Sequence, residues 1–220
     1  MNAIWDYFRG DQSEILGWLW TTVWLAAVPV VAGIAIALPI GWVASRFRWT
    51  YPPAITFAGL VYTIPSIVIF LALPGILGTG ILDPVNVAVA LTLYCVALLV
   101  RVVADGLSSV STDTLSAASA MGYTARQRLL VVQLPLALPV IGAGLRVAAV
   151  SNVSLVAVAS ALGVTQLGQL FVIGNNAAVN GSTPIELGLI MFFLLALLFD
   201  WVILLGLRVA TPWRRVVAAR

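Results

Sequence analysis

Two ionisable side chains, Arg146 and Asp200, stand inside otherwise apolar stretches. If both stretches are helices, Arg146 lies eight residues after Leu138 (138 to 146) and Asp200 eight before Arg208 (200 to 208), about 12 Å from one end in each case. An unpaired charge at that depth in a membrane costs on the order of 2.5–3.5 kcal/mol. We therefore expect an ion pair or a shared polar network. Two other roles stay open: a long Arg146 side chain that reaches the interface, and contact of Asp200 with a cationic substrate.

A second group of polar side chains could line a polar path between helices. Pro65 removes a backbone hydrogen bond in mid-helix and favours a kink, which would leave carbonyl groups beside Thr63 and Ser66 unpaired. The alternative is a kink that serves packing alone. Tyr62 is placed either to stack on a cation or to fill the core. In the fourth apolar stretch, Asn152 and Ser154 either face the path or form hydrogen bonds between helices.

Residue types that are missing exclude several kinds of chemistry. The 220 residues contain no histidine and no lysine, and Cys95 is the single cysteine. Nucleophiles activated by histidine, disulfides within the chain and a cysteine-based metal site are therefore excluded, and we expect no metal and no catalytic residues. A phosphate-binding loop of the GxxxxGK[ST] type needs a lysine. If ATP drives this protein, another subunit must bind it.

The elements that hold these residues are predicted to be membrane-spanning helices. Apolar residues make up 62% of the chain and charged residues 9%, against about 45–50% and 25% in soluble domains. We predict an all-α polytopic membrane protein, a single domain over residues 1–220. A span needs about 20 apolar residues. Five stretches qualify: Ile15 to Ala44, Pro53 to Leu73, Val85 to Val103, Leu138 to Leu162 and Ile185 to Val209.

Arginine placement orients the predicted spans. All eleven basic residues are arginine, and with five spans every arginine outside the membrane except Arg9 falls on one side. The opposite side carries most of the acidic residues. The positive-inside rule then places the N-terminus outside and the C-terminus in the cytoplasm. The acidic start of the chain also lacks the basic region of a secretory signal, so we expect the first apolar helix to stay in the protein.

The cytoplasmic segment at about 105–135 carries its own pattern. Ser, Thr and Asp residues at 108–114 favour turns and helix caps, and the alanines that follow favour a helix. Gly122 is suited to end that helix. A second short helix from about Ala125 leads to Pro135, which favours the start of a new element. We therefore predict two short helices at an angle, with small side chains that allow another protein to approach.

This segment resembles the EAA loop of ABC importer permeases, the MetI-like transmembrane domain. That motif has Glu-Ala-Ala, three residues, Gly, nine residues, an aliphatic residue, one more, and Leu-Pro. Here it reads Ser116-Ala117-Ala118, Gly122, Val132 and Leu134-Pro135, with Ser116 in place of the glutamate. The resemblance implies a coupling helix that docks in a groove of an ATPase subunit. The residues it assigns to coupling are Ser116, Ala117, Ala118, Met121, Gly122, Tyr123 and Pro135.

Further matches cover about residues 16–210. Thr63-Ile64-Pro65-Ser66 is similar to the TIPS signature of permeases for glycine betaine, choline and carnitine, and the stretch 134–141, LPLALPVI, resembles the same subfamily. A spaced set of small and polar residues through the fourth span also matches. Ser154 stands where a glycine is usual, and Thr165-Gln166 where a glycine pair is usual, so the backbone of the outer gate departs from the subfamily.

The resemblance implies a set of partners. Two permease chains, identical or related, would form the path, and an external binding protein would deliver the substrate. A pair of cytosolic ATPases would bind ATP and Mg²⁺, while this chain binds no cofactor and no nucleic acid, and sits in the bacterial inner membrane. A permease for methionine or another amino acid is the alternative within the class. A secondary transporter or channel would show inverted repeats or buried ionisable relays, and a membrane enzyme would need clustered carboxylates.

Overall fold

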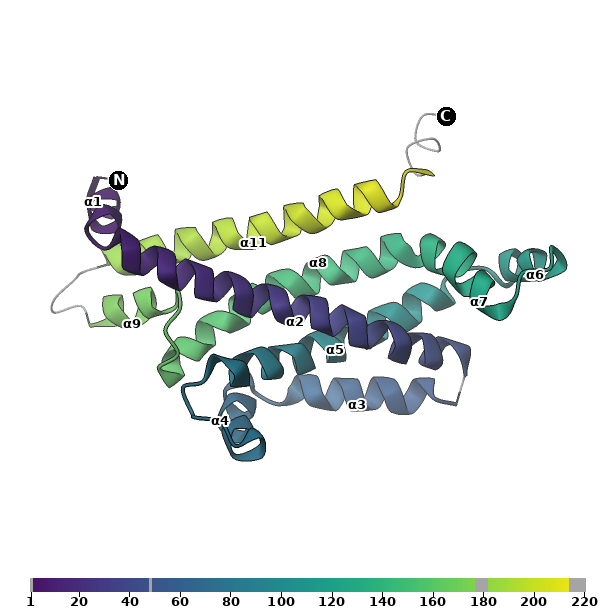
Figure 1. The fold of residues 1–220 in the computed structure, drawn as a ribbon, viewed down its shortest axis with the longest axis horizontal. Coiled ribbons are helices and arrows are strands. Elements are labelled where there is room, and N and C mark those ends of the chain that lie inside the picture. The colour runs from purple at the N-terminus through teal and green to yellow at the C-terminus, as the bar shows by residue number, and fades with distance from the viewer. Residues whose placement is uncertain (1, 48, 177–181, 214–220) are drawn as a thin grey trace.

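The computed structural model describes residues 2–47, 49–176 and 182–213. Four helices run along an elongated bundle (Figure 1): α2 (Gln12–Arg46), α5 (Pro84–Ser108), α8 (Leu134–Val158) and α11 (Thr183–Ala210). Each has 25 residues or more, so each is at least about 37 Å long and can cross a hydrocarbon layer of about 30 Å. No strand occurs among the described residues. Four of the five predicted spans are therefore confirmed as helices long enough to cross a membrane.

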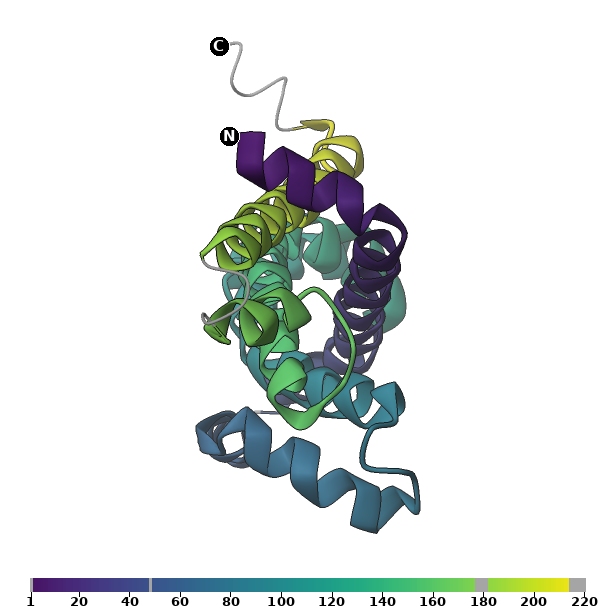
Figure 2. The ribbon, with the colours of Figure 1, turned by 90° about the vertical axis from the view of Figure 1, so that its left-hand side faces the viewer.

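The second predicted span is broken rather than continuous. Helices α3 (Tyr51–Thr63) and α4 (Ser66–Leu77) meet at an angle of 98°. Pro65 has no N–H to offer and forces the preceding residue out of the helical region, and Ile64 accordingly has ψ 127°. The expectation of one helix with a kink was wrong. Viewed along the bundle in Figure 2, α4 lies across the lower edge instead of continuing α3.

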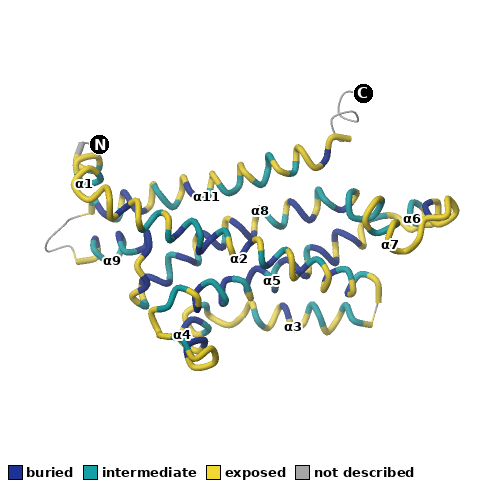
Figure 3. The backbone as a smooth tube through the Cα atoms, in the orientation of Figure 1, coloured by how far each residue is buried: buried dark blue, intermediate teal, exposed yellow. Residues whose placement is uncertain are grey.

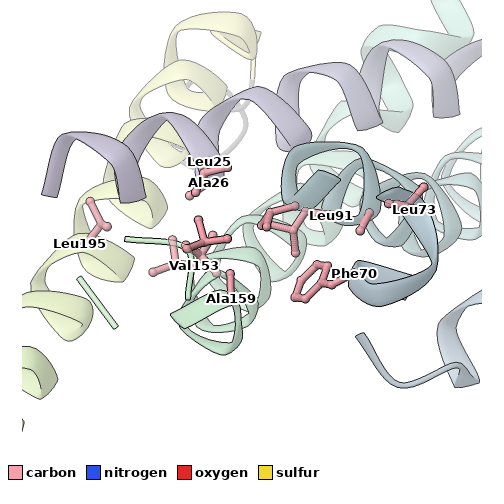
Figure 4. Packing of buried hydrophobic residues seen from close by; sticks show 12 residues of the cluster. Leu25, Ala26, Phe70, Leu73, Leu91, Val153, Ala159 and Leu195 are labelled. Atoms are coloured by element: carbon pink, nitrogen blue, oxygen red, sulfur yellow. The ribbon is translucent and has the colours of Figure 1, made fainter. Parts of the chain in front are cut away.

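The core lies where α2, α5 and α8 meet, and exposed residues dominate the outward faces of α3 and α11 (Figure 3). Side chains from α2, α4, α5, α8 and α11 form one of its clusters (Figure 4), including Leu25, Phe70, Leu91, Val153 and Leu195. Glycines let α2 approach α5: a Cβ built on Gly33 would lie 2.5 Å from the Cβ of Cys95. Close contact of small residues is how helices associate without a hydrophobic driving force.

Shorter elements close both ends of the bundle. One end carries α1 (Asn2–Gly10) and α9 (Gln169–Asn175), and η2 (Ala159–Leu162) extends α8 there. The opposite end carries α6 (Thr112–Ala120), α7 (Ala125–Gln127) and the π-helical segment η1 (Arg128–Gln133). The ends of α2 and α11 lie there too, so Arg46, Arg126, Arg128 and Arg208 gather at one end. With the predicted orientation this is the inner end, and the end with α1 is the outer end. The connection between the fourth and fifth predicted spans, residues 163–184, contains α9, and its residues 177–181 lie outside the described residues.

Candidate functional site: the coupling segment and the membrane interior

Local hydrogen bonds define both ends of α6. Its N-cap is Ser111, whose hydroxyl accepts from the backbone N–H of Thr114 at 3.3 Å. At the other end Gly122 has φ +85°, its N–H donates to the carbonyl of Ser119, and the N–H of Tyr123 donates to the carbonyl of Ala118. These two bonds make a Schellman motif, which requires a left-handed residue and therefore favours glycine. The predicted helix and its glycine stop are confirmed.

The turn after α6 is fixed in the same way. The hydroxyl of Thr124 accepts from the N–H of Gln127, and the side chain of Gln127 accepts from the N–H of Thr124, which is a capping box. Arg128 spans the turn, because its Nη1 donates to the hydroxyl of Ser119 at 2.6 Å. The second short helix predicted from Ala125 is present, although α7 has only three residues before η1 begins. The two short helices are thus held at a set angle.

The surface of this segment suits a docking element. Ser116, Ala117, Met121, Gly122 and Tyr123 are exposed, and Met121 keeps 71% of its surface. Among the residues assigned to coupling, Ala118 is buried and Pro135 is half-buried. Pro135 lies in the first turn of α8, directly after η1. Ala118 therefore supports the segment from inside, while the exposed face carries small side chains together with Met121 and Tyr123.

One contact ties the segment to the membrane helices. The side-chain amide of Gln133 in η1 donates to the carbonyl of Leu107 at 3.0 Å, near the C-terminal end of α5. That carbonyl lies in the last turn of α5, where no backbone partner follows. Movement of α6 can therefore reach α8 through the continuous chain and α5 through this bond. The motif spacing gave no signal for this role of Gln133.

The residues predicted to line a path are not all gathered in one place. Tyr62 and Asn152 line the same small cavity of about 10 Å³, room for about one water molecule. Asn152 is buried and its amide donates to the carbonyl of Ala26 at 2.7 Å, so it joins α8 to α2. Its Oδ1 has no partner among the described residues. Ser154 is exposed and, two residues further along the helix, faces away from Asn152.

The break between α3 and α4 places the TIPS residues at the surface. Thr63 and Pro65 are exposed and Ser66 is half-buried. The hydroxyl of Thr63 donates to the carbonyl of Leu60 at 2.7 Å. The carbonyl of Ile64, which lies at the break and has no backbone partner among the described residues, accepts from the hydroxyl of Tyr94. Sequence reasoning missed this role of Tyr94. The residue lies 30 positions after Ile64 in the chain, and only the packing of α5 brings it to the break.

The two charges of the membrane interior lie together. Arg146 donates through Nε to Oδ1 of Asp200 at 2.6 Å and through Nη2 to Oδ2 at 2.7 Å. The exposed fractions of the two side chains are 37% and 29%. A planar, two-bond pair of this kind is among the stronger polar contacts in proteins. The pair joins α8 to α11, and each carboxylate oxygen of Asp200 accepts one hydrogen bond from Arg146.

The outer end holds contacts that the sequence did not suggest. Gln166 is fully buried, its amide donates to the carbonyl of Val156 at 3.2 Å, and its Oε1 accepts from the N–H of Gly168 at 2.7 Å. The N–H of Leu167 donates to the hydroxyl of Thr22 in α2. Gln166 thus ties the loop after η2 to the C-terminal end of α8. Its only sequence signal was the departure from the usual glycine pair.

With this geometry in view, residues 30–205 match the family described as "Binding-protein-dependent transport system inner membrane component". The chain belongs to that family. It is a multi-pass membrane protein and a transport subunit. Family membership removes the secondary transporter, the channel and the membrane enzyme from the alternatives.

Individual relatives agree with the family. The chain is 35% identical to "Osmoprotectant import permease protein OsmW" of Salmonella typhimurium, over 82% of this chain and 84% of that one. It is 28% identical to "Glycine betaine/carnitine/choline transport system permease protein OpuCB" of Bacillus subtilis, over 96% and 95%. With "Carnitine transport permease protein OpuCD" of Listeria monocytogenes the identity is 31%, over 91% and 87%. The resemblance to osmoprotectant permeases is therefore confirmed at the level of relatives.

Solved structures show the same fold. A chain of the MetNI methionine ABC transporter, in an inward-facing conformation, superposes with a TM-score of 0.78 at 22% identity, over 92% of this chain and 98% of that one. A chain from an amino acid ABC transporter crystallised with histidines gives 0.75 at 19% identity, over 92% and 96%. At these identities the likeness concerns the fold alone.

Proposed function

We propose that this chain is the membrane permease of an ABC importer that carries a small osmoprotectant of the glycine betaine, carnitine or choline type into the cell. The observation that carries the importer role is α6, an exposed small-residue helix capped at Ser111 and ended at Gly122, at the end of the bundle where arginines gather. The substrate class is supported by the names of the relatives and by the TIPS and LPLALP stretches. Nothing comparable favours methionine, since the methionine transporter shares the fold at 22% identity.

The proposed assembly contains two permease chains, a pair of cytosolic ATPases and an external binding protein. ATP and Mg²⁺ are bound by the ATPases, consistent with a sequence that contains no lysine for a phosphate-binding loop. Closure of the ATPase pair moves α6, and the rigid connections of α6 to η1 and α5 convert that motion into alternating access. The exposed Ser116, Ala117 and Met121 form the contact surface.

Reconstitution tests this function. The permease is purified with the ATPase and the binding protein encoded beside it and placed in liposomes. We expect ATP-dependent accumulation of labelled glycine betaine, carnitine or choline, and no accumulation with a non-hydrolysable ATP analogue. Accumulation of methionine but of none of these three compounds would overturn the proposal.

Gly122→Leu tests the coupling role. A leucine would resist the left-handed backbone at φ +85°, at a cost of about 1–2 kcal/mol, although its Cβ meets no atom within 4 Å. We expect uptake per ATP hydrolysed to fall about tenfold with normal membrane insertion. The matched control is Gly206→Leu in α11, where the added Cβ also meets nothing within 4 Å and φ is not positive. Normal coupling in Gly122→Leu would contradict the role of α6.

A further inference from the structure

A hollow separates α3 from α5 on the outside of the core. Its volume is about 330 Å³, and its lining includes Ala58, Gly59, Tyr62, Ala97, Leu98 and Arg101. We name it the α3–α5 groove. Three of these residues are alanine or glycine, and a Cβ added at Gly59 would meet no atom within 4 Å. The groove exists because small side chains face each other where larger ones would fill the space.

One end of the groove is aromatic. Tyr62 packs edge-to-face against Tyr94, with ring centroids 5.8 Å apart and planes at 79°. Tyr94 is buried and anchored by its hydroxyl to the carbonyl of Ile64, whereas Tyr62 keeps 46% of its surface. Tyr62 is thus held in place and still open to the groove. A ring so placed attracts a quaternary ammonium group.

The other end carries a guanidinium with spare donors. Arg101 faces Asp105, but the Nε–Oδ2 distance is 3.8 Å and the Arg101 side chain is 66% exposed. Oδ1 of Asp105 is already engaged by the hydroxyl of Tyr51 at 2.6 Å. Arg101 forms no hydrogen bond with any residue in the described parts of the chain. Arg146, by contrast, gives two short bonds to Asp200. Arg101 therefore has terminal amino groups available for a carboxylate, which it can bind through two bonds.

The aromatic end and the guanidinium end of the groove lie on one face of α5, at a separation that a short zwitterion can span. Tyr94 and Arg101 are seven residues apart (94 to 101), two helical turns, so they share a face at a separation of about 10.5 Å. Side chains in a helix lean towards its N-terminus, and because Tyr94 and Arg101 both lean in this direction the separation is kept at the level of the side chains. Apart from Tyr62 and Arg101, the groove is lined by aliphatic and small residues: Ile55, Ala58, Gly59, Ala97, Leu98 and Val102.

We propose that the α3–α5 groove is a binding site for a short zwitterion, with its quaternary ammonium on Tyr62 and its carboxylate on Arg101. This rests on the proposed osmoprotectant function and names the preferred class within it. Glycine betaine and carnitine satisfy both ends. Choline can bind at the aromatic end alone. It has no carboxylate for Arg101, and its positive charge is repelled by the guanidinium. The groove thereby gives the permease a preference of its own for zwitterions over cations.

The alternative roles of these residues predict a different pattern. If Arg101 serves only as an i,i+4 partner of Asp105, or if a second permease chain or a lipid fills the groove, its loss affects all substrates alike. A site for the carboxylate affects zwitterions alone. The ratio of zwitterion to cation transport therefore separates the alternatives, whereas overall activity does not.

The test uses the complete transporter in liposomes with saturating binding protein, and compares uptake of glycine betaine and choline. For Arg101→Gln we expect the ratio of betaine to choline uptake to fall about tenfold, because a charge-assisted contact is lost, with partial recovery in Arg101→Lys. If wild type carries no choline, binding of the two compounds to the purified transporter is compared instead, and Arg101→Gln should weaken binding of glycine betaine but not of choline, with partial recovery in Arg101→Lys.

Gly59→Leu supplies the matched steric variant. It should fold normally and reduce uptake of both substrates, while Gly206→Leu, an equally open glycine on α11, leaves uptake unchanged. Equal losses of betaine and choline uptake in Arg101→Gln, or an unchanged ratio, would overturn the proposal. A wild-type complex that carries neither compound would instead count against the proposed function.

Discussion

Helix α5 has two neighbours that it contacts in opposite ways. Against α2 there is no spare space: Cβ atoms added at Gly33 and Gly41 would lie 2.5 Å and 2.7 Å from side-chain atoms of Cys95 and Val103. Against α3 there is a groove of about 330 Å³, and a Cβ at Gly59 meets nothing. Glycines in α2 thus allow a close approach to α5, whereas Gly59 in α3 leaves open space beside α5. The α2–α5 contact is built for stability, and the α3–α5 contact leaves room for a ligand.

Two arginines of the membrane helices, Arg146 and Arg101, repeat this contrast. Arg146 is held by Asp200 through two bonds of 2.6 and 2.7 Å, between α8 and α11. Arg101, beside the groove, has a single distant partner at 3.8 Å. A satisfied pair contributes to the fold, and a guanidinium with unused donors is suited to bind something else. The predictions below test each side of that division.

The largest effect is expected from charge reversal in the Arg146–Asp200 pair. Arg146→Asp places two carboxylates together and Asp200→Arg two guanidinium groups, and an uncompensated charge at this depth costs on the order of 2.5–3.5 kcal/mol. We expect each single variant to lose most of its folded protein and the double swap to recover much of it. Folded yield by gel filtration in detergent is the measurement. Strictly additive losses would contradict a direct structural pair, and a stable Asp200→Asn without transport would assign Asp200 to the path.

The next largest effect is expected from a comparison of two glycines on the helices that neighbour α5, Gly41 on α2 and Gly59 on α3. Gly41→Leu forces a side chain against Val103 and the carbonyl of Val100, 3.0 Å from the added Cβ. Overpacking of this kind costs about 1–3 kcal/mol. Gly59→Leu meets no such obstacle and replaces a poor helix former. Unfolding in mixed detergents should therefore show a loss for Gly41→Leu alone. Equal destabilisation by the two variants would mean that the groove is filled in the native protein.

The smallest effect concerns the link between α8 and α2. Asn152→Ala removes the hydrogen bond to the carbonyl of Ala26, and such bonds between membrane helices contribute about 0.6 kcal/mol on average. We expect a loss of that order in the free energy of unfolding, with uptake nearly unchanged. Unchanged stability with lost uptake would instead place Asn152 in the transport path.

Features set by neighbouring residues could be read from the sequence. The caps at Ser111 and Gly122 and the helix lengths follow from local residue preferences. Counting along two helices also put Arg146 and Asp200 at one depth. The 98° turn at Pro65 could not be predicted from the sequence, because a proline permits a break but the packing of Phe70 and Leu73 of α4 into the core cluster sets its direction. Arg101 lies near the end of the third predicted span, Val85 to Val103, where the sequence gives no sign of a binding role; the structure shows that its side chain is exposed and only distantly paired.

One measurement tests the central contrast most directly. Cysteine is introduced at Gly59 in the groove, or at Leu194 on the exposed face of α11, in the complete transporter with the buried Cys95 left in place. We predict that a small hydrophilic thiol reagent labels Gly59→Cys, that glycine betaine slows this labelling more than choline does, and that Leu194→Cys stays unlabelled. Labelling at Gly59→Cys that is absent, or unaffected by glycine betaine, would contradict the account.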